Sequence, residues 1–351
     1  MINKMKVVLF SLLFIFSGIF LMASEPVKIS GDMSHRNVYI DSHDKNNKRR
    51  IQKFFAERMR LQADWKSDNW DYKLGFSTLS SNQLTTSLVQ VGYGGNQNLG
   101  AEDFKCVNAW AQYNSDGNWS ARFGRMTVPF LRYKSELIWD NDLFWDGLYL
   151  TNILEKKNKI SFHAGAFEVY RDLCFRNNKL YVVGLIGTPE IGKNKYEWRI
   201  DHFKYDFSTT RGWSATYAPD YNIVNMYGAV DFPNQIRLTL DLSRNLDAKA
   251  VGTQNKGGDA VNATIVIGKM KKNGNFQIIS QYFQTGVHAV PGSFVSYLRR
   301  LNMSGEQFDL KYRIAKRTNI QLTFLEWKKL ENSLSGDRSY RRLETSLNHE
   351  F

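Results

Sequence analysis

The last strand-length stretch of the chain alternates between two kinds of side chain up to its final residue, Phe351. Such alternation is typical of a strand with lipid on one face and water on the other. Few folds are open to such a chain, because only helices and closed barrels satisfy every backbone hydrogen bond in lipid. The outward set comprises Leu343, Thr345, Leu347, His349 and Phe351, and the inward set comprises Arg342, Glu344, Ser346, Asn348 and Glu350.

Residues 1–23 have the pattern of a secretory signal peptide. Lys4 and Lys6 form its basic region, and residues 7–22 form an almost continuous apolar region. The alternative is an anchor helix, but such a helix normally needs ~20 apolar residues and this stretch is shorter. No later segment approaches that length, so a membrane protein with this sequence has to be a barrel. We therefore predict a signal peptide over residues 1–23 and one barrel domain over residues 24–351.

The overall composition does not argue against a barrel. The mean hydropathy of −0.43 looks soluble, but every second residue of a barrel strand faces water, so the average stays low. Aromatic residues make up 14% of the chain, and many lie near the ends of the predicted strands. This placement predicts aromatic girdles at both membrane interfaces. Examples are Trp65, Tyr72, Trp119, Trp198, Trp213, Tyr217, Trp327 and Tyr340.

The net charge is +13, and removal of Lys4 and Lys6 with the leader lowers it to +11. A basic balance is also typical of nucleic-acid binding, but an exported barrel can hold its positive charge in the lumen, so we predict no nucleic-acid partner. Cys106 and Cys174 would enter an oxidising compartment. They lie on separate predicted elements, so the sequence leaves open whether they are bonded.

Sixteen segments have period-2 character, and a count between 14 and 18 is compatible with the pattern. The fold class predicted from them is all-β, a transmembrane antiparallel up-and-down barrel. The segments are 27–40, 53–66, 69–80, 103–114, 117–126, 158–171, 178–188, 195–207, 210–218, 221–232, 234–245, 259–271, 274–285, 305–314, 317–328 and 338–351.

The connections between these segments alternate between long and short through most of the chain. Long external loops and short periplasmic turns are typical of outer-membrane barrels, whereas a soluble sandwich or propeller does not require them. The longest predicted connection is the third external one, residues 127–157. We expect this loop to fold into the lumen.

One motif opens this loop and a second lies within it. One reads Gly-Arg-Met-x-x-Pro-Phe over residues 124–130, and the other reads Trp-Asp-x-Asp-Leu-x-x-x-Gly over residues 139–147. Together with Arg58, Arg60 and Leu61, and the terminal Phe351, they resemble the putative-porin family of Gram-negative bacteria. A strand ending on an aromatic residue also resembles the signal by which the assembly machinery recognises outer-membrane barrels. The specific motifs cover about residues 24–150, and the bulk of Phe144 and Trp145 departs from the family's pattern.

The resemblance implies an outer-membrane porin, exported through the periplasm, that lets small hydrophilic solutes and ions diffuse passively. Acidic residues of the loop would then face basic residues of the wall, and the excess of bases predicts mild anion selectivity. Each base can instead form an ion pair with a neighbouring acid, and the aspartates of the loop can instead bind calcium. The expected constriction residues are Arg125, Pro129, Glu136, Asp140, Asp142 and Asp146, and the expected wall bases are Arg58, Arg60, Lys73, Arg122, Arg199, Arg237, Lys311 and Arg313.

Catalysis is not expected, because none of the six histidines lies in a hydrolase or metalloprotease motif. No metal site and no cofactor are predicted. The alternative function is an adhesive or structural barrel with a plugged lumen, based on aromatic residues of one external loop: Phe294, Tyr297 and Leu298. Expected partners are membrane lipid and lipopolysaccharide. Trimers are common among sixteen-stranded porins, but the sequence identifies no subunit-contact strand.

Overall fold

A computed structural model describes most of the chain, and the described residues form only strands, turns and irregular segments. No described segment forms a helix that is long and apolar enough to cross a membrane. The described residues are 25–44, 46–79, 89–91, 103–127, 129, 143–156, 159–169, 179–206, 221–248, 257–291, 301–330 and 338–351.

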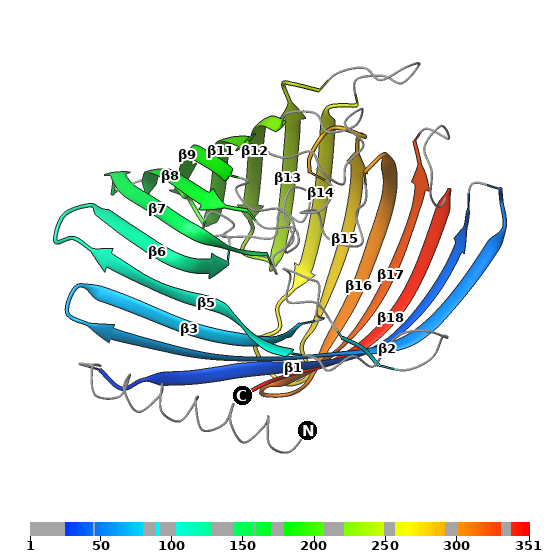
Figure 1. The fold of residues 1–351 in the computed structure, drawn as a ribbon. Coiled ribbons are helices and arrows are strands. Elements are labelled where there is room, and N and C mark those ends of the chain that lie inside the picture. Colours follow the sequence, from blue (N-terminus) through cyan, green and yellow to red (C-terminus); the bar gives the residue numbers. More distant parts are fainter. Residues whose placement is uncertain are drawn as a thin grey trace.

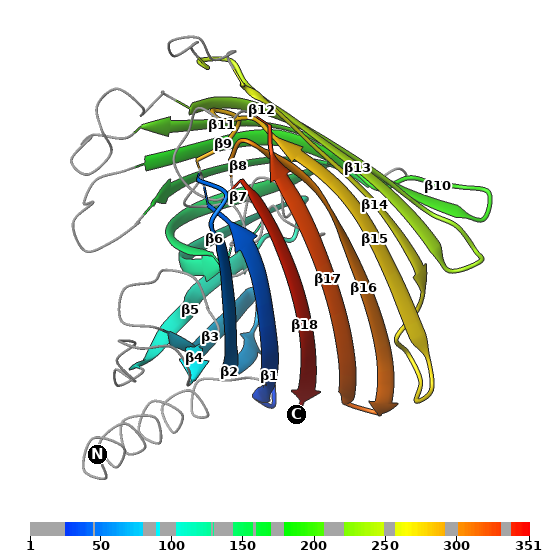
Figure 2. The same cartoon turned by 90° about the vertical axis from the view of Figure 1, so that its right-hand side faces the viewer.

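Sixteen antiparallel strands form one closed sheet, because β1 pairs with β2 on one side and with β18 on the other (Figures 1 and 2). Two short strands lie outside this count: β4 (Val89–Val91) pairs with β2, and β10 (Glu190–Ile191) forms a small hairpin with β11. The wall strands are β1 (Lys28–His43), β2 (Arg49–Ser67), β3 (Trp70–Leu79), β5 (Asp103–Asn114), β6 (Trp119–Thr127), β7 (Phe144–Glu155), β8 (Ile160–Glu168), β9 (Lys179–Gly187), β11 (Asn194–Asp206), β12 (Tyr221–Asp231), β13 (Ile236–Asn245), β14 (Asp259–Gly268), β15 (Phe276–Thr285), β16 (Met303–Ala315), β17 (Thr318–Lys329) and β18 (Ser339–Glu350).

The predicted barrel class and its count of sixteen strands are confirmed, but one predicted element is wrong. Residues 144–155, assigned to the third external loop, form wall strand β7, which pairs with β6 and β8. This strand reduces the predicted 127–157 loop to residues 128–143. The predicted strand 210–218 lies outside the described residues.

Each strand separates an apolar outer face from an inner face that is mostly polar. On β7, Leu148 and Leu150 are exposed large apolar residues, whereas Tyr149 between them is buried. On β16, Phe308 and Leu310 are exposed, whereas Asp309 between them is buried. Exposed apolar rows around a closed sheet are the lipid-facing surface of a membrane barrel, so the buried positions line the lumen.

The two ends of the barrel differ in the length of their connections. At the end that holds residue 28 and the C-terminus, the turns are short, from residues 68–69 to residues 269–275. We call this the termini end. The opposite end carries longer connections such as residues 80–102 and 286–302, and we call it the loop end. Because the strands are antiparallel, successive connections lie at alternate ends, and the loop-end ones are the longer, with the exception of the five-residue connection 44–48.

Candidate pore lining

All eight predicted wall bases lie at inward positions of their strands, and most of them touch carboxylates. On β1 and β2, the Asp32 carboxylate lies 2.7 Å from Arg60 Nε and 3.8 Å from Arg58 Nη2. Between β2 and β3, Lys73 Nζ lies 3.0 Å from Asp64 Oδ1. Partly exposed pairs of this kind hold side-chain positions rather than contribute much stability.

The seam between β18 and β1 adds a basic group that the sequence did not single out. Glu344 of β18 accepts a hydrogen bond from buried Arg342 and forms an ion pair with Arg36 of β1 at 3.2 Å. One carboxylate is thus shared by two guanidinium groups, as Asp32 is shared by Arg58 and Arg60. The period-2 alternation along β1 and β18 was the sequence signal that could have placed Arg36 and Arg342 on the inner face.

Arg122 of β6 differs from the other wall bases, because the described residues place no carboxylate within 4 Å of it. Its Nε donates to Gln112 Oε1 at 2.9 Å, and its guanidinium carbon lies 4.1 Å from the centre of the Trp110 ring. A cation over an indole face is attracted by the ring's quadrupole and keeps its charge. Arg122 therefore presents to the lumen a positive charge that no described carboxylate contacts directly, although Asp71 acts on it electrostatically from a longer distance.

Arg199 belongs to a fully buried group of side chains on β8 and β11. Its Nε lies 2.8 Å from Asp201 Oδ2, and the other carboxylate oxygen of Asp201 lies 2.8 Å from His163 Nε2. His163 is on β8 and Asp201 on β11, so the pair bridges across the middle strand, β9. The residue in register on β9 is Gly184. A Cβ atom there would lie 2.2 Å from Asp201 Oδ1 and 2.5 Å from His163 Nε2, so only glycine leaves room for the pair.

The remaining predicted bases lie closer to the termini end. Arg237 of β13 pairs with Glu197 at 3.2 Å and with Asp231 at 2.6 Å. Arg313 donates to the backbone oxygen of Lys316 in the β16–β17 turn, and Lys311 precedes it on the inward face of β16. Acidic and amide side chains line the neighbouring part of the inner wall.

On the loop-end side of Lys311, Asp309 accepts from Gln307 at 2.9 Å, from Thr323 at 2.5 Å and from Gln321 at 3.2 Å. On β12 and β13, Asn225 donates to Asp241 at 2.6 Å. The Asp309 carboxylate is held by neutral donors of the described residues, so it contributes negative charge to this part of the wall.

The two family-like motifs of the sequence meet as partners in one strand pair. Gly124 faces Gly147, Arg125 faces Asp146 and Met126 faces Trp145 across β6 and β7. Arg125 donates two hydrogen bonds to the Asp146 carboxylate, at 2.9 and 2.8 Å. Asp146 shares its face of β7 with exposed Leu148, so the pair lies on the outer surface near the loop end. The prediction that Arg125 and Asp146 line the constriction is therefore wrong, because Asp146 belongs to a wall strand and points away from the lumen.

The other predicted constriction residues have no described surroundings. Pro129 is a partly buried turn residue between undescribed neighbours. Glu136, Asp140 and Asp142 lie outside the described residues, so their place at a constriction stays a prediction. The residues that motivated the adhesive alternative, Phe294, Tyr297 and Leu298, also lie outside them.

The predicted aromatic girdle is only partly reproduced. Trp65 and Tyr72 stack at 5.3 Å on the outer face near the termini end. Trp327 and Tyr340 stack at 5.2 Å, but both are buried in an inner apolar cluster, so their assignment to a girdle is wrong. Their partners in that cluster are Val38, Ile40, Phe283, Met303 and Leu325, with Phe54 packed against it.

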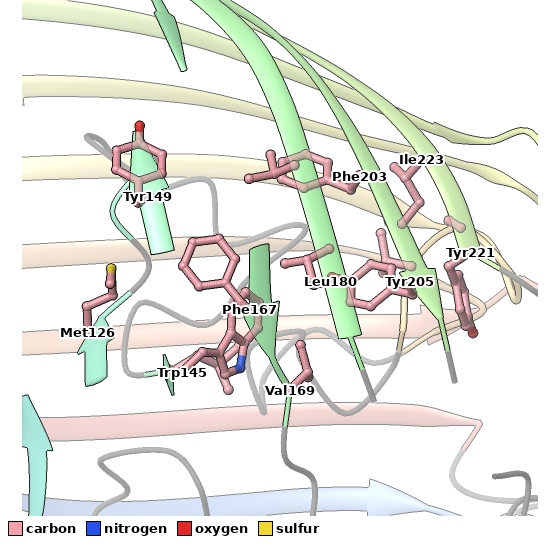
Figure 3. Close-up of a cluster of buried hydrophobic side chains, with 14 of the residues drawn as sticks. Met126, Trp145, Tyr149, Phe167, Val169, Leu180, Phe203, Tyr205, Tyr221 and Ile223 are labelled. Atoms are coloured by element: carbon pink, nitrogen blue, oxygen red, sulfur yellow. The ribbon is translucent and has the colours of Figure 1, made fainter. Parts of the chain in front are cut away.

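A larger apolar cluster covers the inner wall of β6 to β12 in the loop-end half of the barrel (Figure 3). Its centre is aromatic: Trp145 and Phe167 have ring centres 5.8 Å apart, and Tyr205 and Tyr221 lie 6.1 Å apart. Residues from the connections at the loop end also join it. This cluster was not predicted, because the inner face of the strands was expected to be polar. Its members are Met126, Leu143, Trp145, Tyr149, Phe167, Val169, Leu180, Val182, Phe203, Tyr205, Tyr221, Ile223, Ala260, Ala289 and Val290.

The described part of the chain contains no group of three or more histidine, cysteine or acidic side chains that could hold a metal ion. Cys106 of β5 is a free thiol, and Cys174 lies outside the described residues. In the β15–β16 connection, burial lowers the pKa of His288. The Nε2 atom of His288 has no hydrogen-bond partner among the described residues.

The closed sixteen-stranded sheet, with lipid-facing apolar rows and charged groups inside, defines the class as an outer-membrane channel. A family model described as putative porin matches residues 22–234, which is more than half of the chain. The chain belongs to this putative porin family. No curated protein matches it.

Solved porin structures resemble the whole barrel, although their sequences differ. The structure of OprB from Pseudomonas putida at high pH is 10% identical, with a TM-score of 0.64 over 95% of this chain and 96% of that chain. A triple mutant of the Rhodopseudomonas blastica porin is 8% identical, with a TM-score of 0.55 over 93% and 100%. OccK2 from Pseudomonas aeruginosa is 10% identical, with a TM-score of 0.51 over 92% and 98%. At these identities the resemblance concerns the fold.

Proposed function

We propose that this outer-membrane channel passes small hydrophilic solutes passively and prefers anions mildly. The observation that carries the proposal is the position of Arg122, a lumen-facing cation with a neutral hydrogen-bond partner and an aromatic platform. Because the low-dielectric barrel wall concentrates the field of such a charge, Arg122 attracts anions into the pore.

One ion-pair group supports the same sign on the β18–β1 side of the lumen, because Glu344 faces both Arg36 and Arg342. Elsewhere on the wall, Asp309 of β16 is held by neutral donors, and Arg237 of β13 lies between two acids. These acidic groups offset the basic ones, and the expected preference is mild rather than strict.

The proposal also covers the export of the protein, its assembly into the outer membrane and its surroundings there. Residues 1–23 direct export and are cleaved, and the assembly machinery recognises the last strand. Phe351 closes that strand onto β1, with backbone hydrogen bonds to Gly31 at 3.0 and 3.2 Å. Lipopolysaccharide surrounds the loop end, and a homotrimer fits the class. Retention of the protein in the outer-membrane fraction, with an N-terminus at residue 24 by sequencing, would test the export step.

Swelling of proteoliposomes that contain the purified protein tests the transport step. We expect small neutral sugars and small anions to enter, with anions entering faster than cations of equal size. Equal rates for both signs would remove the selectivity claim and leave the diffusion claim. Absence of swelling with every solute would contradict diffusion and favour the plugged barrel.

A further inference from the structure

The connection between β15 and β16 begins with a segment, residues 286–291, that turns toward the lumen. Ala289 and Val290 have no exposed surface and belong to the large inner cluster of Figure 3. That cluster also contains Ala260 of β14, the strand next to β15, and extends from there to Met126 on β6. The segment itself reaches the end of β13, where the buried Asn245 donates to His288 O. The segment therefore lies over the loop-end inner face of β14 and β13 instead of leaving the barrel mouth.

Backbone hydrogen bonds fasten the start of this segment. Gly286 N donates to Asp259 O at 2.9 Å, and His288 N donates to Gly257 O at 3.0 Å. The approach is close at Gly286, where a Cβ atom would lie only 2.1 Å from Gly257 O. Since that oxygen is backbone, any larger residue at position 286 has to move the segment away from β14.

The side chain of Asn245, at the end of β13, ties the segment to two other places. Its Nδ2 donates to His288 O at 2.8 Å, and its Oδ1 accepts from Asn222 N at 3.0 Å and from Asp247 N at 3.1 Å. Asn245 is buried and lies on the inward face of β13. One amide therefore links the segment, the start of β12 and the turn after β13.

An apolar inner wall is an unusual lining for a path that carries hydrated solutes. Porin lumens are normally polar, and here the loop-end half carries Phe203, Tyr221 and Ile223 at inward positions. Burial of these side chains requires other parts of the chain to lie over them. Among the described residues, Leu143, Val169 and the pair Ala289 and Val290 do so from three different connections.

We propose that residues 286–291 form a fixed constriction element, which narrows the pore at the loop end and is held there by Asn245 as a positioning residue. This inference rests on the proposed diffusion function, because its first test measures ion current through the pore. It places a constriction element in the β15–β16 connection, in addition to the one predicted for the connection that precedes β7.

Single-channel recordings of the complete barrel in planar bilayers test the proposal. The variants are Gly286→Ala, which displaces the backbone, Val290→Asp, which places a charge in the apolar cluster, and Asn245→Ala, which removes the tie to His288. Gly228→Ala is the matched glycine control, because nothing lies within 4 Å of a Cβ atom there. Leu246→Asp is the matched charge control, because Leu246 is exposed at the same end.

We expect the three variants to raise conductance on the order of 1.5-fold or more and to add current noise, because a released segment widens the path. Both controls keep the wild-type conductance. Wild-type values in all three variants would overturn the proposal. A wild-type barrel without current would instead overturn the diffusion function.

A second readout does not depend on conduction. In a background without Cys106 and Cys174, Val290→Cys should resist a membrane-impermeant maleimide, whereas Leu246→Cys should react readily. Equal labelling of the two positions in the folded barrel would show that the segment is not seated on the inner wall. This result would overturn the proposal even if the barrel conducts.

Discussion

Gly184→Ala should destabilise the barrel strongly, although it adds a single methyl group. The added Cβ atom would lie 2.2 Å from Asp201 Oδ1, 2.5 Å from His163 Nε2 and 2.7 Å from Ile200 O. The last contact is backbone, so the new atom cannot be accommodated by a side-chain rotation alone. The substitution therefore has to separate His163 from Asp201, and both side chains have no exposed surface.

The expected cost follows from the environment of this pair. The Asp201 carboxylate would keep Arg199 as an ion-pair partner, so the loss is that of one hydrogen bond to a charged group, about 1.5–3 kcal/mol. We expect the free energy of unfolding to fall by that amount. Urea-induced unfolding in phospholipid vesicles, followed by far-UV circular dichroism, measures it. Gly228→Ala, with open space around the added atom, should change the free energy by no more than about 0.5 kcal/mol.

A double-mutant cycle separates the ion pair from simple crowding. In a His163→Ala background one of the two side-chain contacts is absent, so Gly184→Ala should cost clearly less than it does in the wild type. A cost for Gly184→Ala that matches Gly228→Ala would refute the bridge across β9. An undiminished cost in the His163→Ala background would attribute the effect to the backbone contact instead.

Three further predictions address charge, the outer ion pair and the C-terminus. Arg122→Gln should shift the reversal potential under a salt gradient toward the value expected for cation preference. The control Arg341→Gln, at an outward residue paired with Glu326, should leave the reversal potential unchanged. Equal shifts in the two variants would show that Arg122 does not set the selectivity. Arg125→Met and Asp146→Leu should each lower the free energy of unfolding by about 1 kcal/mol, because both side chains are about one-third exposed. Neither variant should change the conductance. Altered conductance would show that the pair does line the constriction. Phe351→Ala should reduce the amount of barrel in the outer-membrane fraction of cells, while the purified protein still conducts; full delivery to the membrane would contradict its role as an assembly signal.

The strands that could be predicted are those whose outer face is continuously apolar. Lipid requires an apolar residue at nearly every outward position, so the alternation on β13, β16 and β18 was strong enough to place them. β7 was not predicted because it contains Asp146 and Glu155 and begins next to an acidic, aromatic stretch, so its residues were assigned to the loop. The alternation of Leu148 and Leu150 with Gly147 and Tyr149 was the signal that could have identified it.

The inner face was less predictable, because water and protein both tolerate polar residues there. Alternation placed the wall bases on the correct face, but their partners depend on the register between strands, as for Arg199 with Asp201. The inner apolar cluster breaks the expected polar pattern at Phe167, Phe203 and Ile223. Only folding of the connections into the barrel explains those residues, and a single sequence does not contain that information.

The most direct test of the account is the reversal potential of the purified wild-type barrel in a planar bilayer under a potassium chloride gradient. The account predicts discrete conductance steps and a reversal potential that corresponds to modest chloride preference. Steps with potassium preference would contradict the assignment of Arg122 and its neighbours as the dominant charges. A folded, inserted barrel that never conducts would contradict the channel itself.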